Sequence, residues 1–86
     1  MNNKLKTGLV VLNYHDYKTT IKLIKMIKNY KSIDLIVIVD NCSTDKSYKK
    51  INEYTNNKIK LIKSDKNGGY AYGNNFGIHY LIENHK

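Results

Sequence analysis

Side chains that could bind a ligand stand where two apolar runs of this chain end. The run Leu35 to Val39 stops at Asp40. The run Leu9 to Leu12 is followed shortly by Tyr14. A carboxylate beside an aromatic ring suits a nucleobase, because the ring can stack on the base and Asp40 can accept a hydrogen bond from a ring N–H such as that of uracil or guanine. The competing interpretation makes Asp40 a helix cap and Tyr14 a loop aromatic.

A glycine-rich stretch is a second candidate for ligand binding. Four of the five glycines of the chain lie within ten residues of the sequence DKNGGYAYGNNFGI. Asn67, Gly68 and Gly69 can adopt positive φ, and their amides at a helix N-terminus could face an anion such as a diphosphate. The alternative is packing, because Gly69, Gly73 and Gly77 recur every four residues and would let one helix face lie close to a sheet.

The other reactive residue types give weaker signals. His15, His79 and His85 have no metal-ligand spacing with Cys42, the only cysteine, so we expect surface histidines and no metal site in this chain. Cys42 has no histidine at a recognisable offset and is interpreted as a small filler residue, not a nucleophile.

Three apolar stretches predict strands, and the three stretches that follow them predict helices. The predicted strands are Thr7 to Asn13, Asp34 to Val39 and Lys58 to Ser64; the predicted helices run from about Tyr17 to Tyr30, Lys46 to Thr55 and Tyr70 to Asn84. Asp16 is expected to cap the first helix, and Ser43, Thr44 and Asp45 supply oxygens for the cap of the second. Apolar residues expected on the inner face of the first helix include Met26 and Tyr30, and Tyr48, Ile51 and Tyr54 are spaced to face the sheet from the second.

This β-α-β-α-β-α order predicts an α/β fold, a three-layer Rossmann-like unit with a mostly parallel sheet. The continuous apolar run Leu35 to Val39 suits a strand buried on both faces, and the lysines of Lys58 to Ser64 suit an edge strand. Right-handed crossovers bring the helix N-termini to one rim of the sheet, where ligands bind in such folds. The polar residues that follow the strands should therefore meet there.

Length and charge limit the classes of function. Eighty-six residues allow a single domain over 1–86, and the net charge of +8 comes with fifteen basic residues that are all lysine. A lysine-rich module for nucleic acid or acidic partners is the alternative function, but the lysines are spread along the chain as in a general residue bias, and we expect no nucleic-acid partner. One cysteine suits a reducing compartment such as the cytoplasm, and an apolar N-terminal run of four residues is too short for a membrane span.

Three segments together resemble a known family. They are VVLNYHDY (Val10 to Tyr17), VIVDNCSTDKS (Val37 to Ser47) and NGGYAYGNNFGI (Asn67 to Ile78). In order and spacing they resemble the N-terminal part of family 2 glycosyltransferases, which are inverting, nucleotide-sugar-dependent enzymes with a GT-A fold. The third segment is closest to the branch that includes rhamnosyltransferases of surface-polysaccharide assembly.

The resemblance implies a set of nucleotide-binding residues: Leu12, Asn13, Tyr14, Asp40, Asn41, Asn67, Gly68, Gly69 and Asn75. By this resemblance, Leu12 and Tyr14 lie against the base of a UDP-, dTDP- or GDP-sugar, and Asp40 contacts the ring N–H. The junction from Asn67 to Asn75 closes over the ribose and diphosphate. Many relatives carry arginine where this chain has Asn74. A direct cationic contact to the diphosphate is therefore not expected at that position.

The resemblance also identifies what this sequence lacks. Family members have a fourth strand that ends in an Asp-x-Asp motif for Mg²⁺ or Mn²⁺, and a later Asp or Glu acts as catalytic base; no Asp-x-Asp occurs here. We therefore expect a truncated nucleotide-sugar-binding portion, with no catalytic residue and no activity alone, or else a self-associating remnant. The family's strand order, 3-2-1-4, leaves the outer edge of the first strand open, which predicts a homo-oligomer through Gly8 to Leu12.

Overall fold

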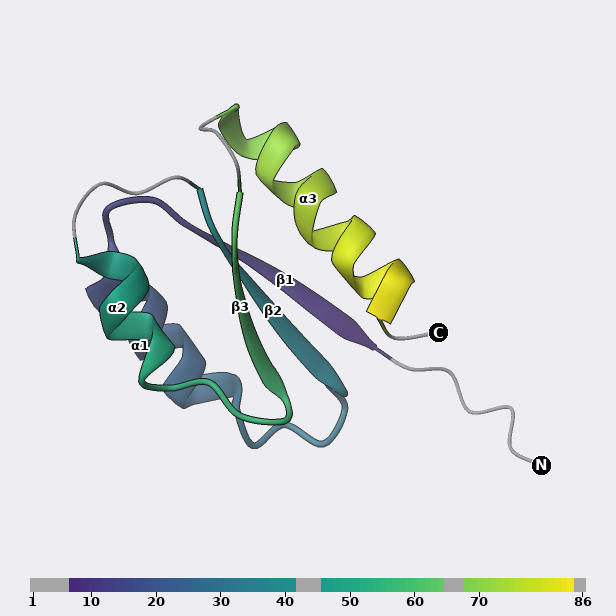
Figure 1. The fold of residues 1–86 in the computed structure, drawn as a ribbon. Helices are drawn as coiled ribbons and strands as arrows, with labels where there is room; N and C mark the ends of the chain where they lie inside the picture. Colours follow the sequence, from purple (N-terminus) through teal and green to yellow (C-terminus); the bar gives the residue numbers. More distant parts are fainter. Residues whose placement is uncertain (1–6, 42–45, 65–67, 85–86) are drawn as a thin grey trace.

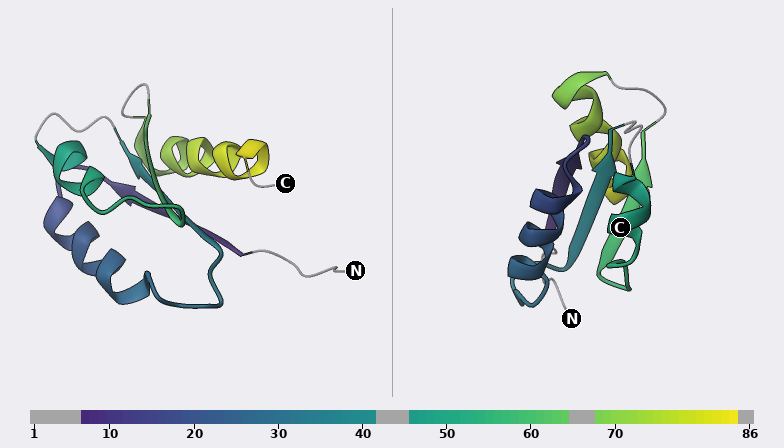
Figure 2. Two further views of the ribbon diagram at one scale, coloured as in Figure 1. Left: turned by 60° about the horizontal axis from the view of Figure 1, so that its bottom comes forward. Right: turned by 90° about the vertical axis from the view of Figure 1, so that its left-hand side faces the viewer.

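The computed structural model describes residues 7–41, 46–64 and 68–84, in which strands and helices alternate. The elements are β1 (Gly8–Asn13), α1 (Tyr17–Ile27), β2 (Leu35–Asp40), α2 (Ser47–Asn52), β3 (Ile59–Lys63) and α3 (Gly69–Asn84). The strands form one parallel sheet in the order β1-β2-β3. Helices α1 and α2 cover one face of this sheet, and α3 covers the other (Figures 1 and 2). The predicted three-layer α/β unit is confirmed.

Strand β2 is the centre of the fold. All six of its residues are buried, and it pairs with β1 along one edge and with β3 along the other. Val37, for example, is aligned with Val10 of β1 and with Lys60 of β3. The continuous apolar run therefore forms the strand buried on both faces that its sequence predicts.

The alternation of side chains along β2 divides the core in two. Ile36 and Ile38 pack in a cluster with residues of α1 and α2, including Ile24 and Ile51. Leu35, Val37 and Val39 pack on the other face against α3, with Phe76, Tyr80 and Leu81. Because one strand supplies both clusters, the two helical layers depend on the same six residues.

Helix α1 is shorter than predicted and buries a narrower face. Its cap is confirmed, since the Asp16 carboxylate accepts a hydrogen bond from the Thr19 amide at 3.4 Å. The buried positions are Thr20, Ile24 and Ile27. Met26 and Tyr30, which were expected on the inner face, are 61% and 50% exposed, so that prediction is wrong. Met26 lies off the line of buried positions, and Tyr30 lies beyond the end of the helix.

Helix α2 has only six residues, of which two, Ser47 and Ile51, are fully buried. Ile51 is fully buried and Tyr54 packs against its cluster, as predicted. Tyr48 is wrongly predicted to face the sheet: it is exposed, and the Lys63 ammonium lies 5.7 Å from its ring centroid. The cap position is Lys46, whose side chain makes no cap hydrogen bond, and the predicted caps Ser43, Thr44 and Asp45 lie outside the described residues.

Helix α3 lies close to the sheet because of two glycines. A Cβ atom on Gly73 would be 2.8 Å from Leu12 Cδ2, and one on Gly77 would be 2.7 Å from Val10 Cγ1. The packing interpretation of these two glycines is confirmed. Gly69 differs from them, since it has φ of 87° at the start of α3 with open space where a side chain would be. None of the helices in the described ranges is long and apolar enough to span a bilayer.

The close approach of α3 predicts a cost for any side chain at Gly77. We expect Gly77→Ala to lower the free energy of unfolding by about 1–3 kcal/mol, because the new methyl group would also lie 3.0 Å from Val39 Cγ2. This loss should exceed the gain of roughly 1 kcal/mol that alanine brings to a helix interior. Asn74→Ala, at an exposed position of the same helix, is the control and should leave stability near that of the parent. Urea unfolding measures both, and an unchanged midpoint for Gly77→Ala would contradict the packing argument.

Strand β1 forms one edge of the sheet among the described residues, and its edge has no charged side chain. The Asn41 amide donates to the carbonyl of Asn13 across the β1–β2 pair. Since N–H and C=O directions alternate along a strand, the backbone groups of Val10 and Leu12 point away from β2. The opposite edge, β3, carries Lys60 and Lys63. The strand order agrees with the three-strand part of the order that the resemblance implies.

Self-association through β1 remains a prediction, and the edge geometry defines its test. Val10→Pro removes one N–H of the open edge and should abolish any oligomer seen by light scattering at micromolar concentration, while circular dichroism stays that of the parent. The matched control is Lys63→Pro, because the neighbouring Ser64 amide donates to the carbonyl of Asp40 and the Lys63 amide therefore faces outward. A parent chain that is monomeric, or a Val10→Pro variant that is folded and still oligomeric, contradicts the prediction.

Candidate functional site

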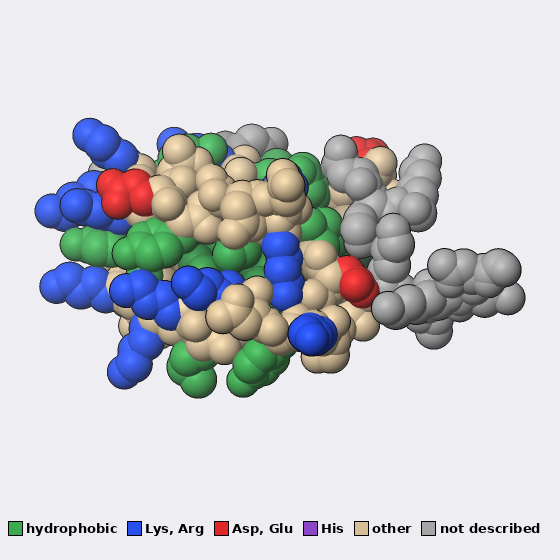
Figure 3. All heavy atoms as spheres, turned by 90° about the horizontal axis from the view of Figure 1, so that it is seen from below, with side chains coloured by type: hydrophobic (Ala, Val, Ile, Leu, Met, Phe, Trp, Pro, Cys, Tyr) green, Lys and Arg blue, Asp and Glu red, His purple; other side chains and the backbone are tan. Residues whose placement is uncertain are grey.

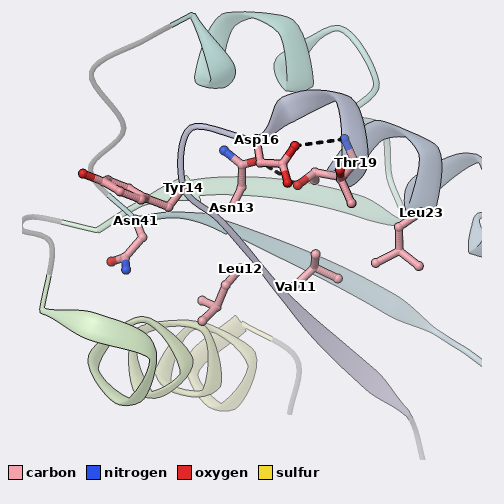
Figure 4. A pocket seen from close by; sticks show the side chains of 9 residues that line it. Val11, Leu12, Asn13, Tyr14, Asp16, Thr19, Leu23 and Asn41 are labelled. Carbon is pink, nitrogen blue, oxygen red and sulfur yellow. Dashed lines mark hydrogen bonds between the residues drawn. The ribbon is translucent and has the colours of Figure 1, made fainter.

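A pocket of about 250 Å³ opens at the carboxyl end of β1, beside the start of α1 (Figure 4). It has apolar and polar lining residues: Val11, Leu12, Asn13, Tyr14, Asp16, Thr19, Thr20, Leu23 and Asn41. Asn41 comes from the end of the neighbouring strand β2. The carboxyl ends of parallel strands are where ligands bind in open α/β sheets, and an apolar wall with a few convergent polar groups is the usual composition of such a site.

A hydrogen-bonded carboxylate lies at the end of β2, next to the pocket residues. The side chain of Asp40 is fully buried, and its Oδ1 accepts a hydrogen bond from Asn13 Nδ2 at 3.1 Å. Asn13 Oδ1 in turn accepts one from the Thr20 hydroxyl at 2.7 Å. All three side chains are buried. Because a buried carboxylate is costly unless hydrogen bonds satisfy it, Asn13 is part of what allows Asp40 to occupy this position.

A second set of hydrogen bonds joins the remaining strand to α3. The Ser64 hydroxyl, just after β3, donates to Asn41 Oδ1 at 3.1 Å. Asn41 Nδ2 donates to the carbonyl of Gly69, the first residue of α3, at 3.4 Å. The ends of β1, β2 and β3 and the start of α3 are therefore connected by side-chain hydrogen bonds at one rim of the sheet.

Tyr14 presents the only aromatic ring among the lining residues of this pocket. Its side chain is 47% exposed and stacks on His15, with ring centroids 4.0 Å apart. His15 has φ of 55°, a left-handed conformation in the turn between β1 and α1, and Asp16 then caps the helix. This turn leaves one face of the Tyr14 ring stacked and keeps much of the residue accessible to a ligand.

The structure brings together four of the residues predicted for the site, and places the others nearby or apart. The four residues that line the pocket are Leu12, Asn13, Tyr14 and Asn41. Asp40 does not line it but accepts a hydrogen bond from Asn13, which does. Gly68 and Gly69 lie at the start of α3, where Gly69 is linked to Asn41. Asn75 is exposed on α3 and does not line the pocket. Asn67 and Cys42 lie outside the described residues.

The cap alternative for Asp40 is not supported, because Lys46 occupies the cap position of α2. The sequence interpretation missed two residues of the network, Thr20 and Ser64. Thr20 could have been found as the polar residue in the helical line of Ile24 and Ile27. Ser64 could have been found because it is a polar residue directly after β3, at the same rim of the sheet where Asn13 ends β1. A polar residue at an otherwise apolar position is the signal in the first case, and equivalent position at a strand end is the signal in the second.

The described residues do not fit the divalent metal that the resemblance associates with full-length relatives. Within 7–41, 46–64 and 68–84, no group of three or more His, Cys, Asp or Glu side chains could hold a metal ion. The acidic side chains near the pocket are Asp16, which caps α1, and Asp40, which is bonded to Asn13.

Comparison with known proteins identifies the family. The family model described as Glycosyl transferase family 2 matches residues 9–81. This range includes β2 and β3, all but the first residue of β1, most of α3 and every residue that lines the pocket. Neither the curated proteins nor the solved structures contain a match to the chain. The family match covers far more than half of the sequence and spans the three segments that carry the resemblance. The chain therefore belongs to the family 2 glycosyl transferases.

Proposed function

We propose that this chain binds the nucleotide diphosphate of a sugar donor and so supplies donor recognition for an inverting glycosyl transfer in polysaccharide or glycan synthesis. The observation that carries the proposal is the pocket at the end of β1, where the accessible Tyr14 ring stands beside Asn13 and Asn41. The family match covers the whole of this pocket. The donor is a UDP-, dTDP- or GDP-sugar.

In this proposal the base stacks on Tyr14 and lies against Leu12. Asp40 accepts a hydrogen bond from the ring N–H of uracil, thymine or guanine. Because Asp40 is fully buried, the base must displace the atoms that cover its carboxylate before it can make this contact. Such a contact is strong, since the acceptor is charged and the surroundings exclude water.

The diphosphate is proposed to lie against the start of α3, where Gly68 precedes the helix and Gly69 is its first residue. Helix α3 has sixteen residues and no acidic residue in its first turn, so its N-terminal amides and dipole favour an anion. Asn67 and Asn75 belong to the same proposed subsite. Asn74 is exposed and uncharged, and the amides would carry the recognition without a cationic side chain at that position.

In this proposal the residues of the sequence supply neither a metal site nor a catalytic base. The sequence contains no Asp-x-Asp motif. The chain's own contribution is then to bind and orient the donor, which accelerates a reaction only when the other groups are in place.

A lysine surface is the second candidate function, because Lys18, Lys22 and Lys25 are exposed along α1. Figure 3 shows lysine side chains gathered at one end of the molecule around apolar side chains. Such a surface would bind polyanions with little preference for the base and with a steep dependence on salt.

Titration calorimetry with UDP, dTDP and GDP distinguishes the two functions. Asp40→Ala should weaken binding of the preferred nucleotide by about 1–3 kcal/mol through loss of a hydrogen bond to a buried donor. Tyr14→Ala should weaken it by roughly 1–3 kcal/mol through loss of stacking. Lys63→Ala is the matched control, since Lys63 is aligned with Asp40 at the same rim and is exposed.

Two results would contradict donor binding. One is nucleotide affinity that survives both Asp40→Ala and Tyr14→Ala but falls with Lys63→Ala or with added salt. The other is a parent chain that binds a short DNA or RNA more tightly than any nucleoside diphosphate.

We also expect no sugar transfer and no donor hydrolysis by the 86-residue chain alone, with or without Mn²⁺. The reason is that neither an Asp-x-Asp motif nor a general base can be assigned in it. Release of UDP, dTDP or GDP from the corresponding sugar donors is the measurement, with host-enzyme contamination controlled by an identically purified Asp40→Ala variant. Turnover by the parent that is absent from that variant would show that the chain is catalytic.

A further inference from the structure

We propose that Thr20 is a positioning residue that fixes the Asp40 carboxylate for base recognition by acting through Asn13; this inference rests on the proposed function. The geometry is a chain of three buried side chains from three elements. Thr20 Oγ1 donates to Asn13 Oδ1 at 2.7 Å, and Asn13 Nδ2 donates to Asp40 Oδ1 at 3.1 Å. Thr20 lies on α1, Asn13 ends β1 and Asp40 ends β2.

The chemistry of the three groups determines the direction of the hydrogen bonds. The Asp40 oxygen accepts from the Asn13 amide, so Asn13 has its Nδ2 toward Asp40 and its Oδ1 toward α1. The oxygen then needs a donor, and Thr20 supplies the hydroxyl there. Thr20 is 5% exposed and Asn13 is 2% exposed, so water has little access to replace that donor.

The position of Thr20 in its helix supports a specific role over a packing role. The residue lies on the buried line of α1 with Ile24 and Ile27. An apolar side chain at this position would extend the core in the ordinary way. A hydroxyl is useful there only if it bonds a polar group, and the group it reaches is the amide bonded to Asp40.

The consequence is selectivity between bases. Uracil, thymine and guanine carry a ring N–H that a carboxylate can accept, whereas cytosine has a bare acceptor nitrogen at the equivalent position of uracil. If Asn13 and Thr20 hold Asp40 in place, the chain should prefer UDP over CDP. If Asp40 is not held in place, the chain should lose its preference for UDP over CDP before it loses affinity for the diphosphate that both ligands share.

The test compares UDP and CDP binding in Thr20→Val, Thr20→Ser and the parent. We expect a UDP preference of about tenfold or more in the parent, since a hydrogen bond to a charged group has at least that effect. It should fall to about one- to threefold in Thr20→Val, which keeps the shape but removes the hydroxyl, and should return in Thr20→Ser. Thr55→Val is the matched control, because the Thr55 hydroxyl donates to the carbonyl of Asn52 in its own turn and the residue does not line the pocket.

An independent readout needs no nucleotide. The side-chain amide protons of Asn13 should exchange slowly with solvent in the parent and in Thr20→Ser, and faster in Thr20→Val, by ¹⁵N-resolved exchange. Should Thr20→Val fail to fold, Thr20→Ala takes its place in both measurements, because the smaller side chain cannot clash.

The outcomes separate the two levels of the proposal. A folded Thr20→Val or Thr20→Ala variant with the parent's UDP preference and the parent's Asn13 exchange overturns the role of Thr20 while leaving donor binding intact. Equal loss in Thr20→Ser also overturns it, since the hydroxyl is present. A parent that binds none of UDP, dTDP, GDP and CDP overturns the proposed function and the selectivity argument with it. Unprotected Asn13 protons in the parent overturn the hydrogen-bonded chain itself.

Discussion

The complete burial of β2 is the constraint on which the rest of this structure depends. A strand with all six residues buried must be covered on both faces and paired along both edges, and this requires α1 and α2 on one side, α3 on the other, and β1 and β3 as neighbours. The same burial carries Asp40 into the rim of the sheet with no exposed atoms. Its carboxylate must then be satisfied by protein donors, and Asn13 provides one of them.

The rim is built by the residues that end or follow each strand. Asn13, Asp40 with Asn41, and Ser64 occupy equivalent places at the ends of β1, β2 and β3, and side-chain hydrogen bonds connect them to α1 and to the start of α3. Because every layer of the fold contributes one partner, the network can form only when the sheet and both helical layers are assembled. The proposed nucleotide site therefore lies where the sheet and both helical layers meet.

The sequence predicts the parts of this structure that depend on local patterns. The apolar run of β2, the Asp16 cap and the spacing of Gly73 and Gly77 each follow from residue types a few positions apart, and each is confirmed. Met26 and Tyr48 were wrongly predicted to be buried. Helical periodicity identifies an apolar face, but it does not determine which side of that face packs against the sheet. Thr20 and Ser64 were missed because their partners are chosen by the fold: Ser64 bonds Asn41 across two neighbouring strand ends that are far apart in sequence. The burial of Asp40 could not be predicted for the same reason.

The contacts of Gly73 and Gly77 also have a consequence for ligand length. Since α3 meets the side chains of Leu12 and Val10 with no side chain of its own between them, the helix cannot approach further, and the hydrogen bond from Asn41 to Gly69 limits how far its first turn can move away. The separation between the Tyr14 ring and the Gly69 turn is therefore set before any ligand arrives. A molecule that touches both must be long enough to span this separation. Binding such a molecule costs the protein little conformational entropy, because both ends of the site are already in place. In the proposed mode of binding, a free base or a bare diphosphate would occupy only one of these two places, so the site would favour a ligand that carries both groups.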